Sequence, residues 1–398
     1  MVGLEVFEIT LKPGTGYKDF DHMTWYVGNA RQAASYYTTR MNFTPIAYKG
    51  PENGSPYTAS YIVQNGGVRF VFVAPVCTPS NQCIPGVERK RLKEIHDHLA
   101  KHGDGVKDIA LQVNMDVKGI WEKAIKHDAH PVMEPVVINA EAPFSGKIQI
   151  ATISAYGDTT HTFVNREGYT GPFLPGYQTV EEKDPINRCL PAIDFIGIDH
   201  CVGNQPWDGV DEVVKFYEEC LNFHRYWTVD DAAMCSDYSA MRSIVVASPD
   251  EVIKMPINEP AVGEKKSQIE EFVDYYNGSG VQHIAFRTSD IITAVTNLRA
   301  RGMEFLSVPS TYYTAIREKL SQSYTVVNES LDILQKLNIL IDFDKGGYLL
   351  QIFSKHVLDR PTVFVEIIQR NNFDGFGAGN FRALFEAFER EQALRGNL

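Results

Sequence analysis

The feature that most limits the possible folds of this chain is a long internal repeat. One run, DFDHMTWYVGNARQAASYYTTRMNF, begins at Asp19, and a second run, GIDHCVGNQPWDGVDEVVKFYEECLNF, begins at Gly197. Both contain an Asp-His pair, a Val-Gly-Asn, a helical segment and a final Asn-Phe, and the two histidines are 178 residues apart. Since one strand and one helix cannot bury their apolar faces alone, the repeat predicts a duplicated chain whose halves share a fold.

Each half contains two copies of a unit with one strand, one helix and three further strands. In the first unit a strand over 19–28 precedes a helix over about 29–41, in which apolar and aromatic residues recur at three- and four-residue steps. Three β-rich runs follow, FTPIAYKG, YTASYIVQN and VRFVFVAP, and the Asn-Gly between the last two favours a hairpin. Four such βαβββ units predict an α+β fold with two open barrels, one in each half.

A change of composition in the middle of the chain predicts the boundary between the halves. From about Glu167 to Ala192 the sequence is rich in Gly, Pro and charged residues, which is typical of a linker. We expect an N-terminal domain over 1–175 and a C-terminal domain over 176–398. A last helix, over about 379–394, is expected to lie over the second barrel.

Composition and charge exclude several classes of partner. With 398 residues, 44% hydrophobic and 22% charged, the chain has a globular composition. Its net charge of −12, with no basic stripe, argues against a nucleic-acid partner, and no apolar run approaches the roughly 20 residues of a membrane span. The six cysteines form no CxxC pair, and the first ten residues lack the basic and apolar regions of a signal peptide. We therefore expect a cytoplasmic protein with reduced thiols.

Three side chains of the second half have the chemistry of metal ligands and stand on apolar strands. His200 lies in FIGIDHCVGN, His283 in GVQHIAFRT and Glu366 in TVFVEIIQR. Either histidine alone would more often be a satisfied core residue. Glu366 is harder to explain in this way, because a buried carboxylate is costly unless it is paired, and no basic residue lies within three positions of it.

The spacing of these residues joins them into one candidate site. His200 and His283 are 83 residues apart, and His283 and Glu366 are again 83 residues apart. In a repeated architecture the strands that carry them can converge on their inward faces. Two imidazoles and one carboxylate form the facial triad that binds non-haem Fe(II) and leaves positions open for substrate and oxygen.

The first half has the scaffold of this site without the same ligands. His22 is present, but Asp108 in GVKDIALQV stands in the place of His283. Aligning HTFVNR with VEIIQR by their final arginine puts Thr162 opposite Glu366. Histidine, aspartate and threonine are a poor ligand set, so we expect the first half to be a structural copy without a metal.

A set of longer motifs covers the second half densely. The motifs are IDHCVGN, RSIVVAS, KMPINEPA, KKSQIEE, GVQHIAF, EFLSVPSTYY, GYLLQIFSK, RPTVFVEIIQR and GFGAGNFRALFEAFEREQALRGNL, and the first half adds FDHMTWYVGNA. Together they resemble the 4-hydroxyphenylpyruvate dioxygenase family of the vicinal-oxygen-chelate superfamily, which includes glyoxalase-like folds. The resemblance implies one Fe(II) per subunit, held by His200, His283 and Glu366.

The same resemblance implies a substrate pocket around the metal. Polar residues around the keto acid would be Ser243, Asn258, Gln268, Gln282 and Gln351, aromatic walls would be Phe353, Phe364 and Phe381, and Phe376, Asn380 and Phe385 would lie near the terminal helix. Phe381 and Phe385 are four residues apart, so they could also simply dock that helix. Gln282 should face away from His283 in an ideal strand, so its role requires a twist or a bulge.

The activity implied by the resemblance is conversion of 4-hydroxyphenylpyruvate and O2 to homogentisate and CO2, in tyrosine and phenylalanine catabolism, by a homodimer. Two other interpretations stay open. One is a hydroxymandelate synthase, which uses the same fold and substrate but hydroxylates the benzylic carbon; the PINEP and GFGAGNF runs favour the dioxygenase. The other is a metal-free binding or scaffold protein with a relic triad, against which the three intact ligands argue.

Overall fold

The computed structural model describes residues 16–80, 84–229 and 240–397. The first half and the linker contain β1 (Tyr17–Tyr26), α1 (Ala30–Met41), β2 (Thr44–Lys49), β3 (Thr58–Asn65), β4 (Val68–Pro75), α2 (Gly86–His102), β5 (Gly105–Val113), α3 (Val117–Lys126), β6 (Pro131–Asn139), β7 (Lys147–Ser154), β8 (Thr160–Asn165), β9 (Gln178–Thr179) and α4 (Ile186–Cys189). The second half contains β10 (Gly197–Asn204), α5 (Val210–Leu221), β11 (His224–Val229), β12 (Ala240–Ala247), β13 (Lys254–Ala261), α6 (Gln268–Tyr276), β14 (Gly280–Arg287), α7 (Ile291–Ala300), α8 (Ser310–Ser321), α9 (Leu331–Leu337), β15 (Leu340–Phe343), β16 (Tyr348–Phe353), β17 (Phe364–Asn371) and α10 (Phe381–Arg395).

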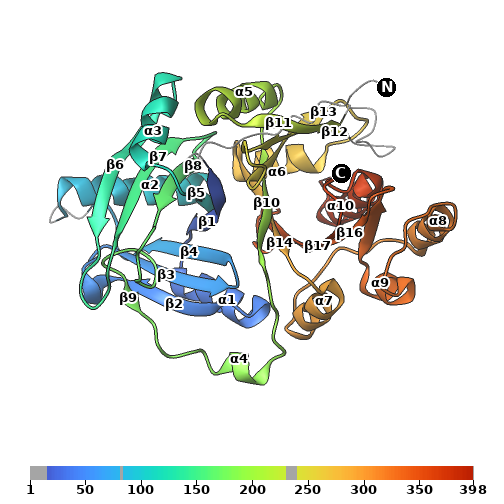
Figure 1. Ribbon diagram of the computed structural model, residues 1–398, viewed down its shortest axis with the longest axis horizontal. Helices are drawn as coiled ribbons and strands as arrows, with labels where there is room; N and C mark the ends of the chain where they lie inside the picture. Colours follow the sequence, from blue (N-terminus) through green and yellow to red (C-terminus); the bar gives the residue numbers. More distant parts are fainter. Residues whose placement is uncertain (1–15, 81–83, 230–239, 398) are drawn as a thin grey trace, which may run out of the picture.

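The strands form two mixed sheets that lie side by side, joined by the linker that carries α4 (Figure 1). Their strand orders are β6-β7-β8-β5-β1-β4-β3-β2-β9 and β11-β12-β13-β10-β14-β17-β16-β15. In each sheet two βαβββ units meet through their first strands, β1 with β5 and β10 with β14, which run antiparallel. The predicted fold class, with its tandem βαβββ modules, is confirmed. The domain division at residue 175 stays a prediction, and β9, within the predicted linker, pairs with β2.

The repeated Asn-Phe of the sequence ends two equivalent helices, α1 and α5. Asn42 and Asn222 have φ values of 59° and 60°, in the left-handed region that Asn adopts more readily than most residues. The amides of Phe43 and Phe223 then donate to carbonyls of the last helical turns, and both rings are buried. The Asn-Phe pair thus ends α1 and α5 and leads the chain into the strand that follows each of them.

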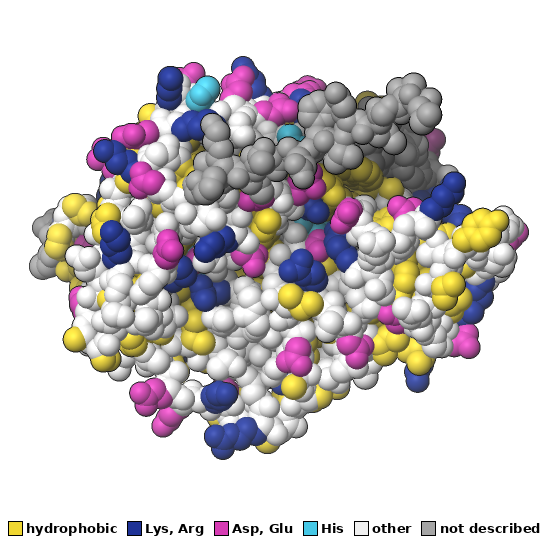
Figure 2. Space-filling view, viewed as in Figure 1, with side chains coloured by type: hydrophobic (Ala, Val, Ile, Leu, Met, Phe, Trp, Pro, Cys, Tyr) yellow, Lys and Arg dark blue, Asp and Glu magenta, His cyan; other side chains and the backbone are white. Residues whose placement is uncertain are grey.

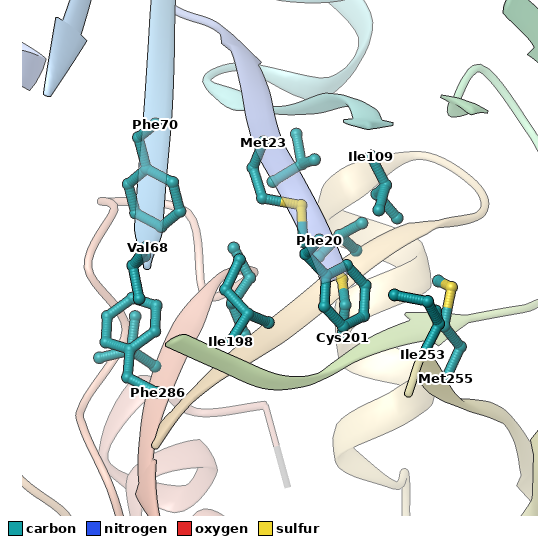
Figure 3. Close-up of a cluster of buried hydrophobic side chains, with 14 of the residues drawn as sticks. Phe20, Met23, Val68, Phe70, Ile109, Ile198, Cys201, Ile253, Met255 and Phe286 are labelled. Atoms are coloured by element: carbon teal, nitrogen blue, oxygen red, sulfur yellow. The ribbon is translucent and has the colours of Figure 1, made fainter. Parts of the chain in front are cut away.

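The hydrophobic core continues from one sheet into the other. Figure 3 shows Phe20 and Met23 of β1 close to Ile198 and Cys201 of β10, with Phe286 of β14 nearby. All five are buried members of one cluster that spans both halves. Since burial of a large apolar side chain contributes about 1.5–3 kcal/mol, packing between the sheets is a main source of stability.

Arg301, at the C-terminal end of α7, ties the second half to the first half and to the linker. It is only 2% exposed. Its guanidinium donates to the carbonyls of Pro191 (2.6 Å) and Thr39 (2.8 Å) and to the side chains of Asn42 (2.6 Å) and Asn187 (3.0 Å). A buried cation with this many donor contacts fixes the linker against α1.

The surface mixes both signs of charge. On the face shown in Figure 2, acidic and basic side chains are interspersed. Within the described ranges, no helix is both long and apolar enough to cross a bilayer. Cys77, Cys189, Cys201 and Cys220 are free thiols, whereas Cys83, Cys235 and the start of the chain, which bear on the thiol and signal-peptide predictions, lie outside the described residues.

Candidate metal centre

His200, His283 and Glu366 come together on three adjacent strands of the second sheet, β10, β14 and β17. Each offers one ligand atom, and these atoms all lie within 4.8 Å of one another. The Nε2 atoms of His200 and His283 are 3.2 Å and 3.5 Å from Oε2 of Glu366. The structure therefore brings together the three residues that were predicted to form a metal site.

The chemistry of this cluster fits a divalent metal ion. Glu366 is 1% exposed, and its Oε1 has no hydrogen-bond partner in the described part of the chain. A buried carboxylate oxygen without a donor is unfavourable unless a cation neutralises it. Two imidazole nitrogens and a carboxylate are the donor set of non-haem Fe(II) sites, so an ion of this kind would satisfy the orphaned oxygen.

The two histidines differ in their electrostatics. Burial acts to lower the pKa of His200, but Glu366 and Asp199 oppose it and raise the pKa to about 9. Burial lowers the pKa of His283, against the opposing effect of Glu366. Burial acts to raise the pKa of Glu366, but the two histidines outweigh it and the pKa is lowered. In the metal-free protein at neutral pH, Glu366 is therefore ionised, His200 is protonated and His283 is neutral.

A β-bulge precedes each of the two histidines. In the pairing of β10 with β14, Asp199 and Gln282 are each an extra residue at a register shift. A bulge re-aims a side chain, so these residues can contact the histidines that follow them, which an ideal strand forbids. Oδ1 of Asp199 is 2.8 Å from Nδ1 of His200, and Oε1 of Gln282 is 3.1 Å from Nδ1 of His283. The bulge that Gln282 was expected to need is present, and both Nε2 atoms remain available to face Glu366.

Strand register supports the equivalence of the two halves at this site. Glu366 stands two residues after the β17 partner of His283, and Thr162 stands two residues after the β8 partner of Asp108. In the first half Thr160 and Thr162 donate to Oδ1 of Asp108, at 2.6 Å and 2.9 Å. A hydrogen-bonded hydroxyl and carboxylate network thus occupies the positions that hold His283 and Glu366 in the second half.

A pocket opens onto the three candidate ligands. All the residues assigned to substrate binding line it, namely Ser243, Asn258, Gln268, Gln282, Gln351, Phe353, Phe364 and Phe381, and Phe376 lines it as well. The pocket therefore combines a possible metal site with amide and hydroxyl groups and an aromatic wall.

The polar groups of the pocket have free hydrogen-bonding capacity. Ser243 and Asn258 are direct partners on β12 and β13. Asn258 donates to Asn204 at 3.3 Å, and its Oδ1 has no partner within the described ranges. Gln282 donates to Gln268 at 3.3 Å. Asn258 can thus accept a hydrogen bond from a ligand hydroxyl.

Aromatic rings enclose both imidazoles. Phe364 stacks on His283 with centroids 4.7 Å apart, and Phe353 meets the same ring edge-on at 6.1 Å. Phe376 meets His200 edge-on at 5.2 Å. These contacts restrict rotation of the candidate ligands and surround them with apolar surface.

Asn380 and Phe385 do not line the pocket. Asn380 accepts a hydrogen bond from Tyr312 at 2.7 Å, and Phe385 packs in a cluster with Ile269 and Phe381. Asn380 thus fixes the start of α10 to α8, and Phe385 docks α10 against α6.

Sequence reasoning missed other residues of the site. Trp227, Met241 and Leu384 line the pocket, but an apolar side chain carries no chemical signal that separates it from the core. Asp199 and Arg370 lie behind His200 and form an ion pair with an N–O distance of 2.8 Å. Both left a signal in the sequence: the Asp-His pair recurs in each half, and so does the arginine that ends the aligned strand segments.

Comparison with known proteins agrees with this geometry. The family model described as the Glyoxalase/Bleomycin resistance protein/Dioxygenase superfamily matches residues 197–352. A probable 4-hydroxyphenylpyruvate dioxygenase 2 of Aspergillus fumigatus is 62% identical over 394 residues, covering 97% of each chain. A 4-hydroxyphenylpyruvate dioxygenase of the same organism is 55% identical, covering 96% of this chain and 94% of the relative.

Among solved structures, a triple mutant of 4-hydroxymandelate synthase from Streptomyces coelicolor superposes with a TM-score of 0.76 at 27% identity, covering 95% of this chain and all of that one. The full-length identity to the two fungal relatives, together with the shared fold, decides the family. The chain belongs to the 4-hydroxyphenylpyruvate dioxygenase family.

Proposed function

We propose that this protein is an Fe(II)-dependent dioxygenase that converts 4-hydroxyphenylpyruvate and O2 to homogentisate and CO2 in tyrosine and phenylalanine catabolism. The observation that carries the proposal is the buried cluster of His200, His283 and Glu366 facing an aromatic-lined pocket, in a chain of this family. Bound iron would supply the oxidative chemistry, namely decarboxylation of the keto acid and hydroxylation of the ring.

The three protein ligands would hold one iron ion per subunit. Because only three coordination positions would be taken by the chain, the others would remain for the keto acid and for oxygen. Decarboxylation of the keto acid supplies the electrons, so no side chain needs to act as a general base.

The remaining pocket residues would orient the substrate and keep water away from the reacting ring. Ser243, Asn258 and Gln268 would offer hydrogen bonds to the phenol end. Oδ1 of Asn258, which has no partner among the described residues, would accept from the hydroxyl group. Phe353 and Phe364 supply an apolar wall against the candidate ligands. Exclusion of water protects a strong oxidant from side reactions. Gln282, Gln351 and Phe381 complete the proposed substrate site.

Further features are proposed from family membership. The chain would act as a cytoplasmic homodimer, with domains over 1–175 and 176–398 and with α10 covering the pocket. Multi-angle light scattering on the purified protein tests the assembly, and a monomer at micromolar concentration would contradict it.

The second candidate is a 4-hydroxymandelate synthase, which the superposition with the Streptomyces enzyme brings into consideration. Incubation with Fe(II), ascorbate and 4-hydroxyphenylpyruvate, followed by mass spectrometry and NMR of the product, separates the two. We expect homogentisate. Formation of 4-hydroxymandelate without homogentisate would replace the first proposal by the second.

The metal ligands are tested by Glu366→Ala and by its matched control Thr162→Ala, at the equivalent position of the first half. Glu366→Ala should abolish iron binding in metal analysis and abolish turnover while leaving the circular dichroism spectrum unchanged. Thr162→Ala should retain both iron and turnover. Normal turnover by Glu366→Ala would refute the proposed ligand set.

A further inference from the structure

The carboxylate of Asp199 is held in place by a side chain that lies 171 residues away in the sequence. Arg370 lies on β17, four residues after Glu366, and its Nε and Nη2 each donate to the carboxylate of Asp199 at 2.8 Å. Its Nη1 donates to the carbonyls of Phe373 at 3.0 Å and Gly375 at 2.6 Å. Both side chains of the ion pair are largely buried. A bidentate pair anchored on both sides has little freedom to turn.

This pair decides which nitrogen carries the hydrogen when the imidazole of His200 is neutral, as it must be to bind a metal. A carboxylate that already accepts two guanidinium hydrogen bonds is ionised and can only accept. The Nδ1 atom of His200, 2.8 Å from Oδ1 of Asp199, must therefore be the donor. Nε2 is then the atom left to bind a metal, on the side of Glu366. Partners behind metal-binding histidines act in this way in other proteins, where they fix ring orientation and raise ligand basicity.

We propose that the ion pair of Asp199 and Arg370 positions His200. The pair holds the imidazole so that its Nε2 faces the iron, and it thereby strengthens iron binding. This effect depends on the bulge at Asp199, because without the extra residue the carboxylate would point away from the imidazole. This inference rests on the proposed iron site.

The first half contains an equivalent pair and supplies a control. Asp21 is the extra residue at a register shift of β1, its Oδ1 is 2.6 Å from Nδ1 of His22, and Arg166 donates to its carboxylate at 2.6 Å and 2.7 Å. There, Asp108 replaces the second histidine of the candidate site. The pair thus belongs to the scaffold of both halves, and its effect on a metal can be separated from its effect on folding.

The test compares Asp199→Asn with Asp21→Asn in the full-length protein. The metal-free forms are titrated with Fe(II) under anaerobic conditions and with Co(II), and thermal unfolding is recorded without metal. Asp199→Asn should weaken binding of both ions about 10- to 100-fold and change the visible absorption of the Co(II) form. Asp21→Asn should bind both ions as the wild type does, even if its melting temperature falls by a similar amount.

Unchanged metal affinity in Asp199→Asn would overturn the inference. The ion pair would then contribute to folding only, and the proposed function would still stand. Failure of the wild type itself to bind Fe(II) would instead overturn the proposed function together with this inference. If Asp199→Asn does not fold, the same comparison is made with Arg370→Lys and its counterpart Arg166→Lys. Lysine keeps the charge but loses the bidentate contact, so only Arg370→Lys should bind metal more weakly, and equal affinity in the two would overturn the inference.

Discussion

Metal binding at the candidate triad should release one proton and should strengthen as the pH rises. A metal ion binds the neutral imidazole, so a proton on a ligand must leave when the ion arrives. The pKa of His200 is raised to about 9 in the metal-free protein, because Glu366 and Asp199 together outweigh burial. The pKa values of His283 and Glu366 are both lowered, so neither contributes a second proton near neutrality.

The size of the effect follows from the pKa of His200. A pH of about 7 lies about 2 units below that pKa, so the apparent metal affinity should be ~100-fold below its high-pH limit, a difference of ~2.7 kcal/mol. Affinity should rise about tenfold per pH unit up to about pH 8.5. The free energy of unfolding of the metal-free protein changes with pH in the opposite direction. The raised pKa of His200 contributes fully to this free energy below about pH 6.5, and the contribution is lost as the pH rises through about 9.

The assay is a competitive titration of the metal-free protein with Zn(II) against a chromophoric chelator at three pH values between about 6.5 and 8.5. Calorimetry in buffers of different ionisation enthalpy counts the protons released. One proton per ion and a slope of about one in log affinity against pH are expected. An affinity independent of pH, or release of two protons, would refute the assigned charges of the three ligands.

Two further predictions concern stability and the pocket. Arg301→Ala should lower the free energy of unfolding by ~1–3 kcal/mol, since it leaves several partly buried acceptors without a donor. Arg301→Lys should lower it less. Chemical denaturation measures both, and a loss below ~1 kcal/mol for alanine would contradict the role of this residue. Gly377 has a φ of 74° just before α10, and a Cβ there would collide with the Gln351 side chain, so Gly377→Ala should lower kcat/KM about tenfold or more in a steady-state assay. The control is Gly396→Ala at the other end of α10, where φ is 73° and no described heavy atom lies within 4 Å of an added Cβ. This variant has a similar backbone strain but leaves the pocket unchanged. Equal losses of kcat/KM in the two variants would contradict the collision argument.

Local signals predicted the elements of the fold because they depend on residues close together in the chain. The helix expected over about 29–41 is α1, which begins after the cap residue Asn29, and the predicted terminal helix is α10. The link between His200 and His283 was also readable, because a duplicated fold brings equivalent strands, here β10 and β14, into the same sheet. Glu366 stands on the last strand of its unit, β17, which pairs with β14.

The repeat, the βαβββ order and the three candidate ligands could thus be read from the sequence by itself. Only the tertiary structure decided how the ligands are supported. Strand alternation turns Gln282 away from His283, and the bulge that reverses this arises from the pairing of two strands about 80 residues apart. The contact between Asp199 and Arg370 spans 171 residues. Pairing register and long-range side-chain contacts depend on the whole packed sheet, so no local pattern of residues specifies them.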